Sequence, residues 1–139
     1  MATFNKFNQF TEDLAEKVHN LGADALTIAL TATASAPVAT NSILANLTQI
    51  AYTNLSARVP TISSSVQTAG VYKLILADLV LTASGAVAAF QYVVLYNDTP
   101  TSPADPLIGW YDYGSALTLA SGETFTIDFD GTGGVLTLT

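Results

Sequence analysis

The chain has 139 residues, a formal net charge of −7 and no cysteine. The length is that of one domain, and the absence of cysteine excludes disulfides, thiolate metal ligands and cysteine nucleophiles. Four basic against eleven acidic residues make nucleic acid a poor partner, because binding to phosphates depends on Lys and Arg, and no apolar run is long enough to indicate a membrane span.

The N-terminal segment, about residues 3–21, is predicted to be one amphipathic helix. Its apolar residues recur at steps of three and four, as one face of a helix requires; they are Phe7, Phe10, Leu14, Val18 and Leu21. We expect Thr3 or Asn5 to cap its start and Gly22 to follow its end. The stripe favours packing on the domain's own sheet over docking on a partner.

After Gly22 the apolar period changes to two, which predicts a first strand over residues 25–31. Residues 42–50 are ambiguous between a short helical turn and irregular chain. Residues 58–68 indicate a loop or an edge strand, because Pro60 has no N–H to donate to a ladder.

From Gly70 onward the pattern predicts a succession of short strands separated by residues that favour turns. The predicted strands are 71–76, 78–82, 89–96, 107–113, 116–119, 124–129 and 135–139, which with 25–31 makes about eight. The separators include Ser84-Gly85, Gly114-Ser115, Ser121-Gly122 and Asp130-Gly131. We therefore expect one mainly β domain over residues 1–139, an antiparallel β-sandwich with a single N-terminal helix.

No arrangement of residues predicts catalysis or cofactor binding. His19 is the only histidine, and near the end of a helix it is expected to be an exposed residue beside the helix dipole. Asp128, Asp130 and Gly131 resemble the opening of a calcium loop, but the Glu required twelve positions along is missing. We expect that the protein is not an enzyme and that it has no catalytic residue, no bound metal and no cofactor.

The glycines near the C-terminus do not predict a phosphate site. The run Gly131-Thr-Gly-Gly precedes a strand rather than opening a helix, and it holds no Lys. It is interpreted as a turn. Acidic residues elsewhere in the second half, including Asp98, Asp112 and Glu123, are interpreted as parts of exposed loops.

Three aromatic residues share the strand predicted over residues 107–113. Alternation places Trp110 on one face of the strand and Tyr111 and Tyr113 on the other. Three interpretations stay open for these rings: packing in the core, a contact with another subunit, and stacking on sugars.

Charge is distributed unevenly along the chain. Only 11% of the residues are charged, against about 25% in a typical soluble domain. Beyond Lys73 there is no basic residue, and the second half carries the whole acidic excess. Such a surface favours contact with other protein subunits, since the centres of interfaces are depleted in charge.

Four stretches occur together in a recognisable order. They are Phe4-Asn-Lys-Phe-Asn-Gln-Phe to His19-Asn-Leu-Gly-Ala-Asp, Phe90-Gln-Tyr-Val-Val-Leu-Tyr-Asn-Asp-Thr, Leu107-Ile-Gly-Trp-Tyr-Asp-Tyr-Gly and Gly122-Glu-Thr-Phe-Thr-Ile-Asp-Phe-Asp. In these stretches, which span nearly the whole chain, the sequence resembles a family of small proteins encoded among the virion genes of tailed bacteriophages and prophages.

The resemblance implies a structural protein, in the first place a capsid decoration or cement protein. Such a protein binds the major capsid protein on the outer surface of the shell and stabilises it. The resemblance further implies a homo-oligomer, most commonly a trimer, that is assembled in the host cytoplasm and located on the capsid exterior, with neither nucleic acid nor membrane as partner. No functional residues carry over from the family.

The contact residues are therefore inferred from the sequence itself. We expect Phe4 and Phe7 on the helix, and Trp110 and Tyr113 on the strand, to contact partner subunits. Two further hypotheses remain: a tail or fibre-attachment component of the virion, and a carbohydrate-binding module for host attachment. The carbohydrate hypothesis requires Trp110 or Tyr111 to be exposed.

Overall fold

The computed structural model describes residues 2–139. It contains one α-helix and nine strands, and 46% of the chain is strand. The elements are β1 (Asn5–Lys6), α1 (Asn8–Ala15), β2 (Leu26–Thr31), β3 (Ile62–Thr68), β4 (Val71–Leu76), β5 (Leu79–Thr82), β6 (Val87–Asn97), β7 (Leu107–Leu119), β8 (Thr124–Ile127) and β9 (Leu136–Leu138), with 3-10 turns at Thr33–Ser35 and Leu44–Asn46.

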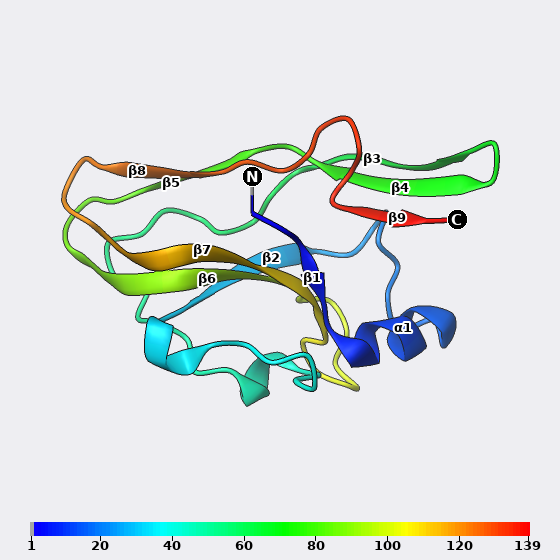
Figure 1. The fold of residues 1–139 in the computed structure, drawn as a ribbon, viewed down its shortest axis with the longest axis horizontal. Helices are drawn as coiled ribbons and strands as arrows, with labels where there is room; N and C mark the ends of the chain where they lie inside the picture. Colours follow the sequence, from blue (N-terminus) through cyan, green and yellow to red (C-terminus); the bar gives the residue numbers. More distant parts are fainter. Residues whose placement is uncertain (1) are drawn as a thin grey trace.

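The strands form three antiparallel sheets. The largest has the order β1-β7-β6-β2, the second has the order β3-β4-β9, and β5 pairs with β8 in the third. Figure 1 shows the two smaller sheets side by side in one layer, with the four-stranded sheet in a second layer beneath them. The predicted fold class, a mainly β antiparallel sandwich with one N-terminal helix, is confirmed.

The main core fills the space between the two layers. Ile28, Leu74 and Phe90 are all fully buried there. These residues come from β2, β4 and β6, so both layers contribute. Alternation along β4, β5 and β8 supplies the apolar face of the layer formed by the two smaller sheets, as in a half-buried antiparallel sheet.

The outer face of the four-stranded sheet is also covered. A second apolar cluster there includes Phe7, Val94 and Leu107, with Leu44 and Leu47 packed against it. Leu44 and Leu47 belong to the long connection between β2 and β3, which runs beneath the sheet in Figure 1. Every residue of β2 is consequently buried.

The predicted helix over residues 3–21 is wrong in its extent. The helix covers only Asn8–Ala15, and residues 5 and 6 form β1 instead. Phe7 occupies the N-cap position without a side-chain cap, so neither Thr3 nor Asn5 caps the helix. No helix among residues 2–139 is long and apolar enough to cross a membrane.

The helix ends at a left-handed residue other than the expected Gly22. Lys17 has φ +67°, and the N–H of Val18 donates to the carbonyl of Asp13 at 2.8 Å. The N–H of Lys17 reaches the carbonyl of Leu14 at 3.4 Å. These two bonds form a Schellman motif, which terminates the helix before the apolar stripe ends.

The strand predictions hold with one structural difference in β7. Two strands were expected over 107–113 and 116–119, with a turn at Gly114-Ser115, but β7 runs unbroken through them. The register against β6 shifts between Phe90 and Tyr92, and Gly114 has φ +93°. The expected turn is therefore a bulge, at which glycine relieves the left-handed conformation.

A buried polar cluster joins the segment that follows α1 to the end of β6. The amide nitrogen of Asn97 donates to Nδ1 of His19 at 3.1 Å and to Oδ2 of Asp24 at 2.6 Å, and its oxygen accepts from the N–H of Thr99. His19 is only 6% exposed, so the expectation that it is exposed is wrong. Because Asn97 is fixed as the donor, neutral His19 accepts at Nδ1 and carries its proton on Nε2.

This cluster predicts that acid weakens the fold. Burial lowers the pKa of His19, and the nearby Asp13 and Asp24 oppose the shift. Folded His19 thus resists protonation while unfolded His19 accepts a proton below about pH 6.5. Its contribution to stability is full above that pH and is lost as the pH falls through the lower folded-state pKa.

The measurement is the free energy of unfolding in urea for the wild-type chain and for His19→Gln, between about pH 7 and about pH 5. Glutamine retains an oxygen that accepts from Asn97 but does not titrate. We expect the wild-type protein to lose more stability than the variant across this interval. Parallel curves for the two proteins would contradict the assignment.

Candidate functional site: a groove at the open edge of the sandwich

The structure divides the four expected contact residues between two faces of the four-stranded sheet. Phe7 and Trp110 lie on the outer face, where their ring centroids are 4.5 Å apart. Phe4 packs on Tyr111 at 5.1 Å, against the main core, and Tyr113 packs edge-on against Phe125 at 5.6 Å. The four residues therefore do not form one surface.

Exposure separates them further. Phe7 is fully buried, so its side chain has no surface to offer a partner in this fold. Trp110 and Phe4 are half-buried. Tyr113 is 53% exposed and is the member of the set that is free for contact.

Tyr113 lies on the side of the sandwich where both layers end. Within residues 2–139, β8 pairs with β5 alone, and β1 pairs with β7 only through Trp110 and Gly109. The rest of β7, from Tyr111 onward, is an edge of the four-stranded sheet. Two edge strands of opposite layers thus face each other, and the sandwich is open between them.

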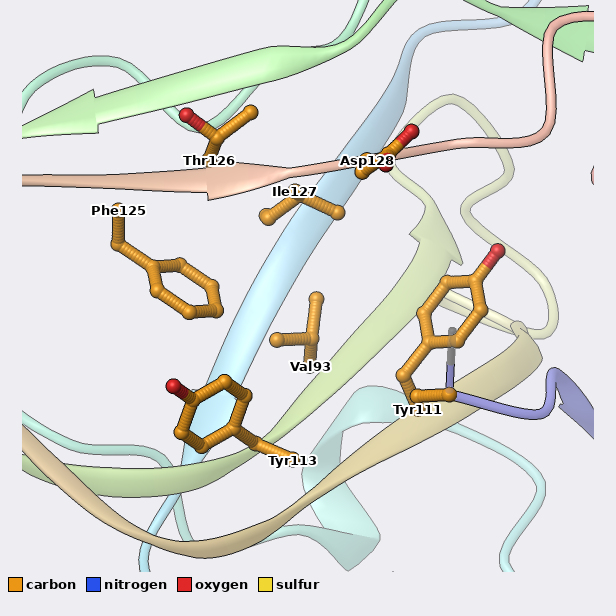
Figure 2. A pocket seen from close by; sticks show the side chains of 8 residues that line it. Val93, Tyr111, Tyr113, Phe125, Thr126, Ile127 and Asp128 are labelled. Carbon is orange, nitrogen blue, oxygen red and sulfur yellow. The ribbon is translucent and has the colours of Figure 1, made fainter.

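A groove occupies this opening. Its first hollow has a volume of about 170 Å³, and it is lined by Ala2, Val93, Tyr111, Tyr113, Phe125, Thr126, Ile127 and Asp128. Figure 2 shows Phe125 and Ile127 pointing from β8 toward Val93 and the two tyrosines, whereas Thr126 points away. The floor belongs to the main core, since Val93 is 4% and Ile127 5% exposed.

A second hollow continues the groove along the same two strands. It has a volume of about 510 Å³ and shares Tyr113 and Phe125 with the first. Its other lining residues are Leu117, Thr118, Leu119, Gly122, Glu123 and Thr124. The groove ends where the turn between β7 and β8 crosses from one layer to the other.

Hydrogen bonds hold this closed end in place. The N–H of Ala120 donates to Oε2 of Glu123 at 2.8 Å, and the N–H of Glu123 donates to the carbonyl of Ala120 at 3.0 Å. Ala83, directly after β5, binds both Gly122 and Glu123 through its backbone. The two edge strands are therefore fixed relative to each other at this end.

The free edge of β8 carries backbone groups that have no partner strand. Because the carbonyl of Glu123 accepts from the N–H of Ala83, directly after β5, this carbonyl points toward β5. Backbone groups alternate in direction along an antiparallel strand. The N–H and C=O groups of Thr124 and Thr126 thus lie on the free edge, and both residues are exposed.

The rim of the groove is acidic. Glu123 lies at the closed end and Asp128 at the other. Burial, together with Asp130 and Asp128, raises the pKa of Tyr111 to about 12. The hydroxyl of Tyr111 is protonated at neutral pH, as that of an ordinary tyrosine is, and it can donate a hydrogen bond.

Asp130, one of the residues that resemble the opening of a calcium loop, has a structural role. Oδ1 of Asp130 accepts from the backbone N–H groups of Thr132 and Gly133 at 2.9 and 2.6 Å, and these bonds lower the pKa of Asp130. This is the turn expected at Asp130-Gly131. Residues 2–139 contain no group of three or more His, Asp or Glu side chains placed to hold a metal ion.

The sequence singled out Tyr111 and Tyr113 as aromatic candidates for contact, but it did not indicate the rest of the groove. Phe125 and Ile127 alternate with threonines, which identifies a half-buried strand. Nothing in that alternation shows that β8 and β7 are both edges, because strand order depends on pairings between distant segments. The available signal was that Thr124 and Thr126 face outward. On any strand, however, this pattern indicates exposure to solvent and not the lack of a neighbouring strand.

The N-terminal strand that borders the groove depends on Gly109. A Cβ at this position would lie 2.6 Å from the carbonyl oxygen of Asn5 and in contact with the Phe4 ring. We expect Gly109→Ala to displace β1, to separate Phe4 from Tyr111 and to lower the free energy of unfolding by about 1–3 kcal/mol.

Urea unfolding of both proteins measures this effect. Gly131→Ala is the matched control, because a Cβ there meets no atom within 4 Å and the backbone is not left-handed. The control should change stability by less than about 0.5 kcal/mol. Equal stability of Gly109→Ala and the control would show that β1 is not packed as described.

In comparison with known proteins, no protein-family model, no curated protein and no solved structure matches the chain.

Proposed function

We propose that this chain is a non-enzymatic structural protein of a tailed-bacteriophage particle, a capsid decoration protein that binds the major capsid protein on the outside of the shell and stabilises it. The sequence resemblance supports the location on a phage particle. The groove between β7 and β8 is the surface that we propose contacts the capsid. We further propose a homo-oligomer, in the first place a trimer, with neither nucleic acid nor membrane as partner.

The observation that carries the proposal is the exposed, aromatic, open edge of the sandwich. Tyr113, Phe125 and the floor residues Val93 and Ile127 form an apolar surface that reaches the core. Apolar side chains of a partner that packed on this surface would be removed from water, which favours association. Aromatic side chains at its centre are the type that contributes most binding energy in protein interfaces.

The charge distribution supports a place away from the packaged DNA. The chain has no basic residue after Lys73, and the acidic residues Glu123 and Asp128 border the groove. An acidic surface is repelled by phosphate. A protein that binds the outer side of the shell meets capsid subunits and not DNA.

The geometry disfavours the carbohydrate-binding alternative. That hypothesis requires an exposed Trp110 or Tyr111, but both rings are half-buried, and Trp110 packs on Phe7 at 4.5 Å. A sugar-binding platform presents a free ring face for stacking. Tyr113 is exposed, but its ring is packed edge-on against Phe125.

The experiment that tests the location is cryo-electron microscopy of the purified particle. Density for many copies spread over the shell is the expected result. Density confined to the tail or to one vertex would replace the decoration role with a tail or fibre-attachment role. Absence from the particle would remove both.

The contact surface is tested by Tyr113→Ser, with binding measured by co-sedimentation with shells that lack this protein. Loss of a central aromatic ring from an interface weakens binding by about tenfold or more. Val66→Ser is the matched control, because Val66 is 55% exposed against 53% for Tyr113 but lies on β3, away from the groove.

We expect the control to bind shells as tightly as the wild-type protein does. Reduced binding of Val66→Ser with normal binding of Tyr113→Ser would place the contact on the β3–β4 face instead. Thermal melting of both variants verifies that each is folded.

A further inference from the structure

We infer that the groove captures an extended segment of another protein, which adds a strand to the free edge of β8 and carries apolar side chains flanked by Lys or Arg. This inference rests on the proposed function in that both use the same surface. It goes further, because it specifies the conformation and the chemistry of the segment that is bound.

The backbone of β8 provides the template. The N–H and C=O groups of Thr124 and Thr126 lie on an edge with no partner strand among residues 2–139. An extended peptide that pairs with such an edge satisfies its own backbone groups and those of the edge. From Glu123 to Asp128 the edge is about 20 Å long at ~3.3 Å per residue.

The groove provides the side-chain specificity. Phe125 and Ile127 point from β8 into the opening toward Tyr113 (Figure 2). A strand added beside β8 points every second side chain in the same direction. Those side chains fill the two hollows over Val93 and Tyr113, while the alternate ones remain in solvent.

The charges provide the third requirement. Glu123 and Asp128 stand at the two ends of the β8 edge, and Asp130 lies close enough to Tyr111 to affect its pKa. No basic residue lines either hollow. A segment with Lys or Arg at its ends is therefore attracted, and an acidic segment is repelled.

A second copy of the chain does not meet these requirements. Two grooves placed face to face bring Glu123 and Asp128 of one copy against the same residues of the other. Of the basic residues in strands, Lys73 lies in β4, which is paired on both sides, and Lys6 lies in β1, an edge strand of only 2 residues that is too short to fill the groove. The occupant is consequently a different protein.

The test is selection of peptides on the whole purified protein. The probe is a cell-surface display library of random peptides of about ten residues, long enough to span the edge. We expect enriched sequences with apolar residues at every second position and Lys or Arg near the ends. Binding of a synthesised peptide should weaken as salt rises, because exposed ion pairs are screened.

A pair of variants isolates the backbone contribution. Thr126→Pro removes an N–H on the free edge, where proline is compatible with an edge strand, and Thr126→Ala retains that N–H. We expect Thr126→Ala to bind the selected peptide normally and Thr126→Pro to bind it about tenfold more weakly or not at all.

A second measurement uses the unmodified protein. The selected peptide is synthesised with N-methyl groups on alternate amides, in two versions that block opposite edges of the peptide strand. One version should lose binding and the other should retain it. Equal binding of both would overturn strand addition even if Thr126→Pro fails to fold.

Three other results would overturn the inference. They are enrichment of acidic peptides, enrichment of sequences with a helical period, and a library that yields nothing whose binding depends on Tyr113. Self-association that disappears in Tyr113→Ser, without any selected peptide, would assign the groove to a second copy.

These results are separate from those that test the location. If this protein binds the selected peptides but is absent from the shell, the inference of strand addition stands and the decoration role is excluded. If density for this protein covers the shell but no added strand lies beside β8, the decoration role stands and strand addition is excluded.

Discussion

The antiparallel pair of β6 and β7 is the constraint on which the rest of the structure depends. These are the two longest strands, with 11 and 13 residues, and they form the centre of the four-stranded sheet. β2 pairs with β6 along its whole length and β1 pairs with the start of β7. Both apolar clusters use their side chains, so the main core and the covered outer face are organised by the same pair.

The same pair explains why the sandwich is open on one side. β7 is flanked by β1 at Gly109 and Trp110 but extends beyond it to Leu119. The chain then turns and continues as β8 in the other layer. β7 therefore begins inside the four-stranded sheet and ends at its edge. β8 then begins at the facing edge of the other layer. Closing the opening would require a further strand, which residues 2–139 do not contain.

The sequence was sufficient for the elements whose signals are local. The strand over 71–76 and the class of fold follow from alternation and turn residues alone. The helix did not end where its apolar stripe ends, because Leu21 still packs in the core after the chain leaves the helical conformation at Lys17. The apolar pattern indicates which side chains point into the core, but it does not indicate whether the backbone between them is helical. The groove was not predictable, because it depends on which strands lack a neighbour.

The groove's floor has a thermodynamic consequence. Val93 and Ile127 belong to the core, and they also line the hollow beside Tyr113 and Phe125. A ligand that covers them enlarges the core of the protein to which it binds. Occupancy and folding are then linked, and the stability of the domain rises with the logarithm of the ligand concentration above its dissociation constant. A subunit held in place would be harder to unfold than the same subunit in free solution, so attachment and durability would be two aspects of one equilibrium.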